Sequence, residues 1–122
     1  MTTAEVANRL VALCKEFKNF EAMETLYEPD IVSVEPFPGP DGSFETNGKA
    51  AVIQKSANWA QAHEIHAASV EGPYVGVDKF SVIFNFEITH KASGNRKHVR
   101  EVGIYTMDGG LITREEFHVA HF

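Results

Sequence analysis

Two histidines three residues apart, His63 and His66, are candidates for metal ligands or for acid–base groups. On a helix, residues i and i+3 lie on one face and could bind one metal ion. On a strand, successive side chains alternate between the two faces, so residues three apart point to opposite sides of the sheet. The zinc-protease pattern needs histidines four residues apart, one more than the chain has here. The chemistry of this pair therefore depends on the element that holds it.

A second set of candidates lies on the last two predicted strands, residues 97–107 and 111–121. Two-residue turns at Gly94-Asn95 and Asp108-Gly109 would pair these strands with the preceding strand and with each other. In that register, five ionisable side chains lie on the same face as Phe84 and Phe86, namely Glu101, Tyr105, Arg114, Glu116 and His118.

Polar groups that converge on an apolar concave wall are typical of a small-molecule pocket. A network of ion pairs at the open end of the sheet is the alternative interpretation. If either turn has three residues instead of two, the last strand turns Phe117 and Val119 inward and its charged side chains outward.

The elements that would position these side chains follow from the hydrophobic periodicity. A capping box of Thr2 and Glu5 starts the first helix, and strict alternation from Phe80 to Thr89 indicates a strand. We predict further helices from Asn19 and over 49–61, and further strands over 31–35 and 63–75. Three helices followed by long antiparallel strands predict an α+β domain, with the helices packed on one face of a curved sheet.

This arrangement places His63 at the start of a strand, so His63 and His66 would face opposite sides and could not share a metal ion. Gly72-Pro73 favours a bulge in the same strand, which leaves open which of the two histidines faces inward. In either register one histidine reaches the inner face, and no metal site is predicted.

Composition narrows the function further. With 122 residues and 43% hydrophobic content, the chain predicts one compact domain over residues 1–122. A formal net charge of -6 makes nucleic acid an unexpected partner. One cysteine, Cys14, gives neither a disulfide framework nor a cysteine-based zinc site. We expect no signal peptide, no membrane span and a cytoplasmic location.

Four segments carry a resemblance to a known superfamily, "LYEPDIVSVEP", "NGKAAVIQKSANW", "HEIHAASVEGPYV" and "EVGIYTMDGGLITREEF". Together with the order of elements, they resemble the SnoaL-like and ketosteroid-isomerase-like proteins of the nuclear-transport-factor-2-like superfamily. The resemblance covers nearly the whole chain. It implies a cone-shaped α+β fold, also called cystatin-like, with a pocket between three helices and a mostly antiparallel sheet.

The resemblance also implies roles for individual residues. Glu35 matches the carboxylate base of ketosteroid isomerases, which abstracts a proton next to a carbonyl. Val11 and Gly103 match the two oxyanion-hole donors of those enzymes, so both donors are missing and steroid isomerisation is not expected. Tyr105 stands one inward position away from Gly103.

The sequence therefore predicts a cofactor-independent acid–base enzyme, of isomerase, cyclase or dehydratase type, acting on a hydrophobic, oxygen-bearing metabolite. The alternatives are a non-catalytic ligand-binding module and a dimerisation domain. The expected catalytic residues are Glu35, Glu116 and His118. The expected ligand-binding residues are Tyr27, Trp59, His63, Phe84, Phe86, Glu101, Tyr105 and Arg114. A homodimer is expected through an outer sheet face that carries Ile83, Asn85, Val102, Ile104, Thr113, Phe117 and Val119.

Overall fold

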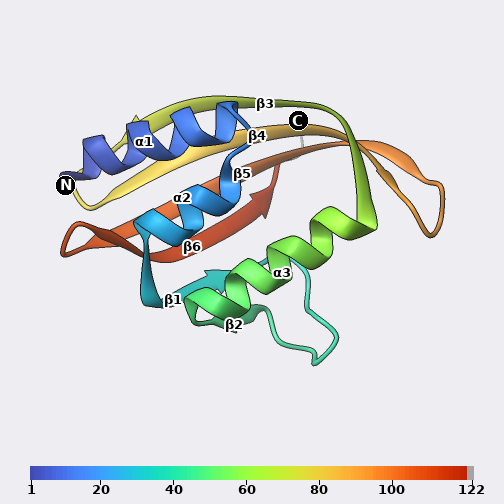
Figure 1. The fold of residues 1–122 in the computed structure, drawn as a ribbon, viewed down its shortest axis with the longest axis horizontal. Coiled ribbons are helices and arrows are strands. Elements are labelled where there is room, and N and C mark those ends of the chain that lie inside the picture. The colour runs from blue at the N-terminus through green and yellow to red at the C-terminus, as the bar shows by residue number, and fades with distance from the viewer. Residues whose placement is uncertain (121–122) are drawn as a thin grey trace.

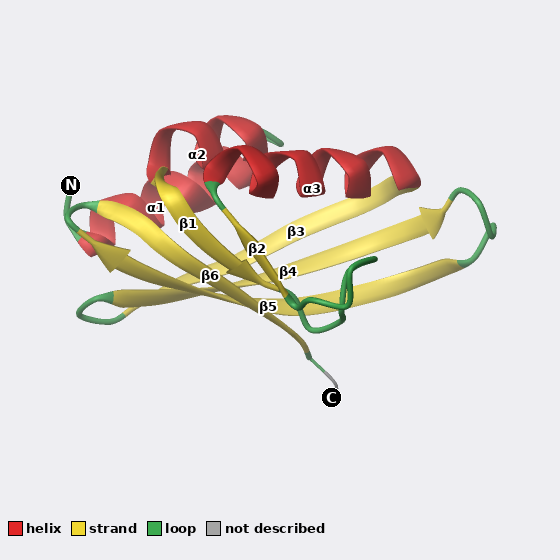
Figure 2. Ribbon diagram, turned by 90° about the horizontal axis from the view of Figure 1, so that it is seen from below, coloured by secondary structure: helices red, strands yellow, loops and turns green. Residues whose placement is uncertain are grey.

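Three helices cover one face of a curved six-stranded sheet (Figures 1 and 2). The computed structural model describes residues 1–120. The helices are α1 (Thr3–Lys15), α2 (Asn19–Leu26) and α3 (Lys49–Ala62). The strands are β1 (Tyr27–Val34), β2 (Glu45–Asn47), β3 (His63–Val75), β4 (Lys79–His90), β5 (Arg96–Asp108) and β6 (Leu111–Val119).

The sheet has the order β2-β1-β6-β5-β4-β3 and does not close into a barrel within the described part of the chain. Strands β1 and β6 pair in parallel, and the other neighbouring strands pair antiparallel. The predicted α+β class is confirmed. The largest difference in bounds is at the first strand, which begins at Tyr27 instead of residue 31. The last strand ends at Val119, and residue 121, its predicted end, lies outside the described residues.

Local sequence explains where the first helix begins and which side it buries. Thr2 and Glu5 form the predicted capping box, with the Glu5 amide 3.1 Å from Thr2 Oγ1 and the Thr2 amide 3.0 Å from Glu5 Oε1. Residues at helical spacing then pack against the sheet, including Val6, Leu10 and Leu13. The hydrophobic core therefore lies between the helices and the inner face of the sheet.

The inner face of β4 and β5 was predicted correctly, although the pairing partners were not. The two-residue turn would place Glu101 opposite Ile88, whereas Glu101 pairs with Phe84, four residues along β4. The residues between Thr89 and Arg96 form a longer loop than the two-residue turn expected at Gly94-Asn95. Since the register differs by an even number of residues, Glu101 and Tyr105 still face inward with the phenylalanines.

A β-bulge overturns the predicted face of β6. The turn pairs Asp108 with Leu111, and a register shift follows between Thr106 and Met107, so Tyr105 lies opposite Glu115. One additional residue on β6 turns every later side chain to the other face.

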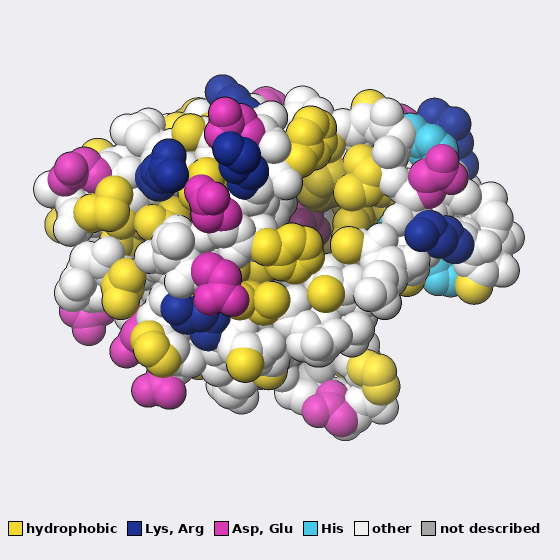
Figure 3. Space-filling model, in the orientation of Figure 1, with side chains coloured by type: hydrophobic (Ala, Val, Ile, Leu, Met, Phe, Trp, Pro, Cys, Tyr) yellow, Lys and Arg dark blue, Asp and Glu magenta, His cyan; other side chains and the backbone are white. Residues whose placement is uncertain are grey.

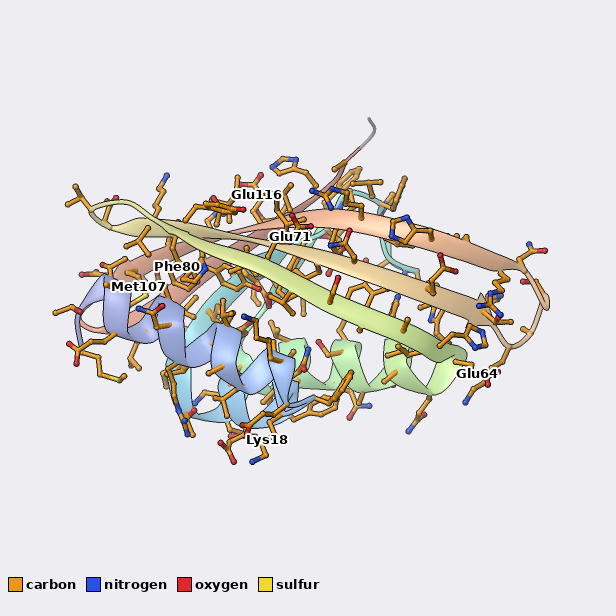
Figure 4. All side chains as sticks on the ribbon, turned by 90° about the horizontal axis from the view of Figure 1, so that it is seen from above. Lys18, Glu64, Glu71, Phe80, Met107 and Glu116 are labelled. Carbon is orange, nitrogen blue, oxygen red and sulfur yellow. The ribbon has the colours of Figure 1, made fainter. Side chains whose placement is uncertain are left out.

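The prediction that Arg114, Glu116 and His118 face inward is therefore wrong. Figure 4 shows Glu116 on the side of the sheet away from the helices, whereas Phe80 and Met107 lie on the side of α1. Phe117 and Val119, predicted on the outer face, lie on the inner face instead. The homodimer expected through the outer face stays a prediction.

The two histidines of β3 lie on opposite faces of the sheet. His63 pairs with His90, and a register shift between Ile65 and Ala67 places His66 on the outer side, where its Nε2 lies 2.7 Å from Thr89 Oγ1. His63 is thus the histidine that reaches the inner face.

Candidate functional site

A lysine and a carboxylate form an ion pair where β1 ends. Lys55 Nζ lies 2.8 Å from Glu35 Oε1 and 2.6 Å from Ser33 Oγ. Ser33 is fully buried, whereas the side chains of Lys55 and Glu35 are 28% and 35% exposed. The lysine therefore ties the end of β1 to α3 and holds the Glu35 carboxylate in one place at the rim of the inner face.

Glu101 is a second inward carboxylate, on β5. Burial, together with the negative charge of Glu35, raises its pKa to about 7, against the lowering effect of the positive charge of Lys55. At neutral pH this group is present in both its protonated and its ionised forms, so it can donate or accept a proton.

Glu115 is the most deeply buried carboxylate of the group, with 2% of its surface exposed. Burial raises its pKa to about 7, against the lowering effects of the Lys55 charge and of a hydrogen bond from Tyr27. That hydrogen bond runs from Tyr27 Oη to Glu115 Oε2 at 3.1 Å. The parallel pairing of β1 with β6 also sets Glu115 beside Ser33, the residue that Lys55 contacts. Glu115 is therefore the third carboxylate near Lys55.

Tyr105 presents a hydroxyl group without a protein partner. Its side chain is 98% buried, it lies opposite Glu115 in the sheet, and its ring stacks on Phe80 with centroids 4.9 Å apart. No hydrogen bond joins the hydroxyl to any residue in the described part of the chain. Because every fully buried side-chain oxygen there has a partner, this unpartnered hydroxyl is not completely enclosed by protein atoms.

Burial raises the pKa of Tyr105 above its usual range, and the charges of Glu115, Cys14, Glu101 and Glu35 add to the rise. The phenol therefore stays protonated at neutral pH and acts as a hydrogen-bond donor.

Aromatic side chains extend from this polar cluster along the inner face. The rings of Phe84 and Phe86 stack with centroids 6.2 Å apart, and Trp59 on α3 lies 5.8 Å from Phe86. Figure 3 shows a hollow between the helices, walled by hydrophobic side chains, with an acidic side chain at depth. An apolar wall with a few polar groups at its end is the usual composition of a small-molecule site.

Two further hollows have none of Glu35, Glu101 and Glu115 in their lining. One, of about 260 Å³, is lined by Cys14, Lys15, Phe17, Ala68, Ser69 and Val70. The other, of about 220 Å³, is lined by Ala67, Ala68, Ser69, Asn85, Glu87 and His98. We place the candidate chemistry at the carboxylates because neither hollow gathers acid–base groups around an unpartnered donor.

Comparison with known proteins agrees with this architecture. The model of the SnoaL-like domain family matches residues 1–119. The chain belongs to the SnoaL-like family. No curated protein matches it.

Solved structures place this SnoaL-like protein among related folds. A Mesorhizobium loti protein, described as a candidate SnoaL-like polyketide cyclase and, in brackets, a carbohydrate phosphatase, is 44% identical with a TM-score of 0.91. The match covers 97% of this chain and 99% of the other.

Two more distant structures share the fold alone. A nuclear-transport-factor-2-like protein from Burkholderia thailandensis is 12% identical with a TM-score of 0.83, and the match covers 98% of this chain and 92% of the other. A protein of ketosteroid-isomerase-like fold from Catenulispora acidiphila, in complex with trimethylamine, is 19% identical with a TM-score of 0.70. That match covers 96% of this chain and 86% of the other.

The structure brings together part of the predicted site of this SnoaL-like protein. The residues it gathers on the inner face are Glu35, Trp59, His63, Phe84, Phe86, Glu101 and Tyr105. Tyr27 lies in the core with its hydroxyl on Glu115. Arg114, Glu116 and His118 lie on the opposite face, so they do not join the cluster.

Sequence reasoning missed Lys55, Ser33 and Glu115. Lys55 follows Val52 by three residues and precedes Trp59 by four, so helical spacing could have shown that it shares their face of α3. Glu115 could not be found in this way because its inward direction depends on the bulge in β6.

Among residues 1–120, no group of three or more histidine, cysteine, aspartate or glutamate side chains is arranged to hold a metal ion. No helix in the same range is long and apolar enough to cross a membrane.

Proposed function

We propose that this SnoaL-like protein is a cofactor-independent acid–base enzyme that acts on a hydrophobic, oxygen-bearing metabolite, in an isomerase, cyclase or dehydratase reaction. The observation that carries the proposal is that the inner face holds Glu35, Glu101 and the Tyr105 hydroxyl together with a row of aromatic side chains. Such a site can move a proton without a metal ion or an organic cofactor.

Glu35 is the proposed base. Its carboxylate is partly exposed, and its ion pair with Lys55 holds it in place at the rim of the inner face, where it can accept a proton. In the proposed reaction Glu35 takes a proton from the carbon next to a substrate carbonyl, and the electron pair moves to the carbonyl oxygen. Return of the proton to another carbon completes an isomerisation, and attack of the resulting carbanion on a second carbonyl gives a cyclisation.

Glu101 and Tyr105 are the proposed donors to the substrate oxygen. Protonated Glu101 and the Tyr105 hydroxyl would each donate a hydrogen bond that strengthens as negative charge develops there. In this chain the two donor positions of ketosteroid isomerases match Val11 and Gly103, which are both buried. Valine has an apolar side chain and glycine has none, so neither side chain can donate a hydrogen bond. Neighbouring side chains would therefore supply the same chemistry.

Names of related structures support an enzyme of this class. The 44% identical Mesorhizobium loti protein is described as a candidate polyketide cyclase, and proteins of similar fold from Rhodopseudomonas palustris and Bacillus subtilis are described as candidate isomerases. The fold also serves non-catalytic proteins, so the function must be argued from the site.

Deuterium exchange tests the proposal. A panel of cyclic and aromatic ketones is incubated with the protein in D2O, and loss of the proton next to the carbonyl is followed by NMR. We expect exchange above the buffer rate, a decrease of about 100-fold or more in Glu35→Gln, and a decrease in Glu101→Gln. Glu87→Gln, on the outer face of β4, is the control and should exchange at the wild-type rate.

Two results would overturn the proposal. Exchange that stays at the buffer rate for every ketone, with ligands bound tightly, would indicate a binding module. Exchange that survives in Glu35→Gln would exclude Glu35 as the base.

A further inference from the structure

The histidine that faces inward has a partner across the sheet. His63 and His90 form a directly opposed pair between β3 and β4, and their ring centroids lie 5.2 Å apart with an angle of 51° between the ring planes. Both side chains are half-buried, so water and small ions can reach them. This pair lies outside the carboxylate cluster and plays no part in the proposed reaction.

A hydrogen bond anchors one ring nitrogen of each histidine. His63 Nδ1 lies 2.8 Å from the carbonyl oxygen of Trp59, and since a carbonyl only accepts, Nδ1 carries the hydrogen in neutral His63. His90 Nδ1 lies 2.8 Å from Ser93 Oγ. Metal-binding histidines usually donate from their second nitrogen to an oxygen in this manner, which orients the ring and leaves Nε2 for the ion.

The separation of the two rings suits a tetrahedral ion. A histidine nitrogen binds Zn²⁺ at about 2.0–2.1 Å, which puts each ring centre about 3.2 Å from the ion and, at a tetrahedral angle, the two centres about 5.2 Å from each other. The observed centroid distance is 5.2 Å.

We propose that His63 and His90 form a two-histidine site for a divalent transition metal ion, with Zn²⁺ as the best fit. Two neutral imidazoles are suitable ligands for Zn²⁺, which prefers four-coordinate tetrahedral sites. No third protein ligand is arranged around the pair in the described part of the chain, so two positions on the ion stay open for water or for an oxygen of a bound ligand.

The site adjoins the outer end of the aromatic wall. The ring of Trp59 stacks on His63 with centroids 4.4 Å apart, and its centroid lies 5.8 Å from that of Phe86. A ligand that lies along this wall could thus meet the ion with a carboxylate or phosphate oxygen.

Titration with Co²⁺ and Zn²⁺ tests the site directly. Co²⁺ in a tetrahedral site absorbs visible light far more strongly than the octahedral hydrated ion, so we expect a visible band on titration, displaced by Zn²⁺. Replacing a metal ligand should weaken binding at least as much as losing its outer hydrogen-bond partner, about 10–100-fold. We expect that loss in His63→Gln and in His90→Gln.

His66→Gln is the matched control, because His66 belongs to the same strand but faces the other side of the sheet. It should bind Co²⁺ as the wild type does. If His66→Gln weakens binding as much as His63→Gln does, or if the band is absent from the wild type, the proposal is wrong.

A measurement on the wild type keeps the test valid if a variant fails to fold. Long-range ¹H–¹⁵N spectra report each histidine ring nitrogen separately. On addition of Zn²⁺, the Nε2 signals of His63 and His90 should shift together while those of His66 stay in place. A shift of only one of the two signals would contradict a shared ion.

Discussion

Glu115→Gln is the substitution that most directly tests the raised pKa of the buried Glu115 carboxyl group. Glutamine has nearly the same shape as glutamate and still offers an oxygen to the Tyr27 hydroxyl. It removes ionisation and puts an NH2 group in place of one carboxyl oxygen. Because Glu115 is 98% buried, its ionisation carries a large free-energy difference.

The magnitude follows from the pKa of Glu115. One pKa unit corresponds to about 1.4 kcal/mol, so raising the pKa from 4.5 to about 7 makes the ionised side chain unfavourable by about 3 kcal/mol in the folded protein. Below pH 4.5 the group is protonated in both the folded and the unfolded state, and the pH has no effect through it. Between pH 4.5 and 7 the unfolded state loses the proton first, so the free energy of unfolding falls as the pH rises.

Urea denaturation at pH 4.5 and pH 8 measures this effect. We expect Glu115→Gln to match the wild type within about 1 kcal/mol at pH 4.5 and to be more stable by about 3 kcal/mol at pH 8. Glu116→Gln, on the adjacent residue but on the outer face, should differ little from the wild type at either pH. A difference between wild type and Glu115→Gln that is the same at both pH values would refute the reasoning.

Three further substitutions have expected outcomes. Lys55→Met removes the positive charge that lowers the pKa of Glu101 and of Glu115, so both pKa values should rise above 7 in carboxyl ¹³C titrations. Gly103→Ala should lower the free energy of unfolding by about 1–3 kcal/mol in urea denaturation, because the added carbon would lie 3.0 Å from the Tyr105 ring and 3.1 Å from the Phe117 ring. Thr2→Ala should cost about 1 kcal/mol in the same assay, since it removes the side-chain oxygen that caps α1.

The elements and their faces were predictable wherever the side-chain pattern was regular. Alternation from Phe80 to Ile88 identified β4, and the even register difference kept Glu101 and Tyr105 on the predicted face despite the wrong partners. The capping box likewise marked the start of α1.

The rest of the site depends on a bulge and on strand pairings that no local sequence pattern predicts. The bulge in β6 adds one residue between the partners of Met107 and Thr106. Because of this residue, Glu115 faces the inner side of the sheet and Glu116 faces the outer side. The bond between Tyr27 and Glu115 joins residues 88 positions apart and arises from the parallel pairing of β1 with β6. The contact between His63 and His90 depends in the same way on the register of β3 and β4.

The inner face of the sheet holds two buried carboxyl groups, those of Glu101 and Glu115, whose pKa values burial raises to about 7. Their titration can be measured by following the side-chain carboxyl ¹³C signals of glutamate-labelled protein from pH 3 to pH 9. We expect Glu101 and Glu115 to titrate near pH 7. Glu71 should titrate below the ordinary value of 4.5, because a hydrogen bond from Arg100 lowers its pKa. Titration of Glu101 and Glu115 near pH 4.5 would contradict the raised pKa values.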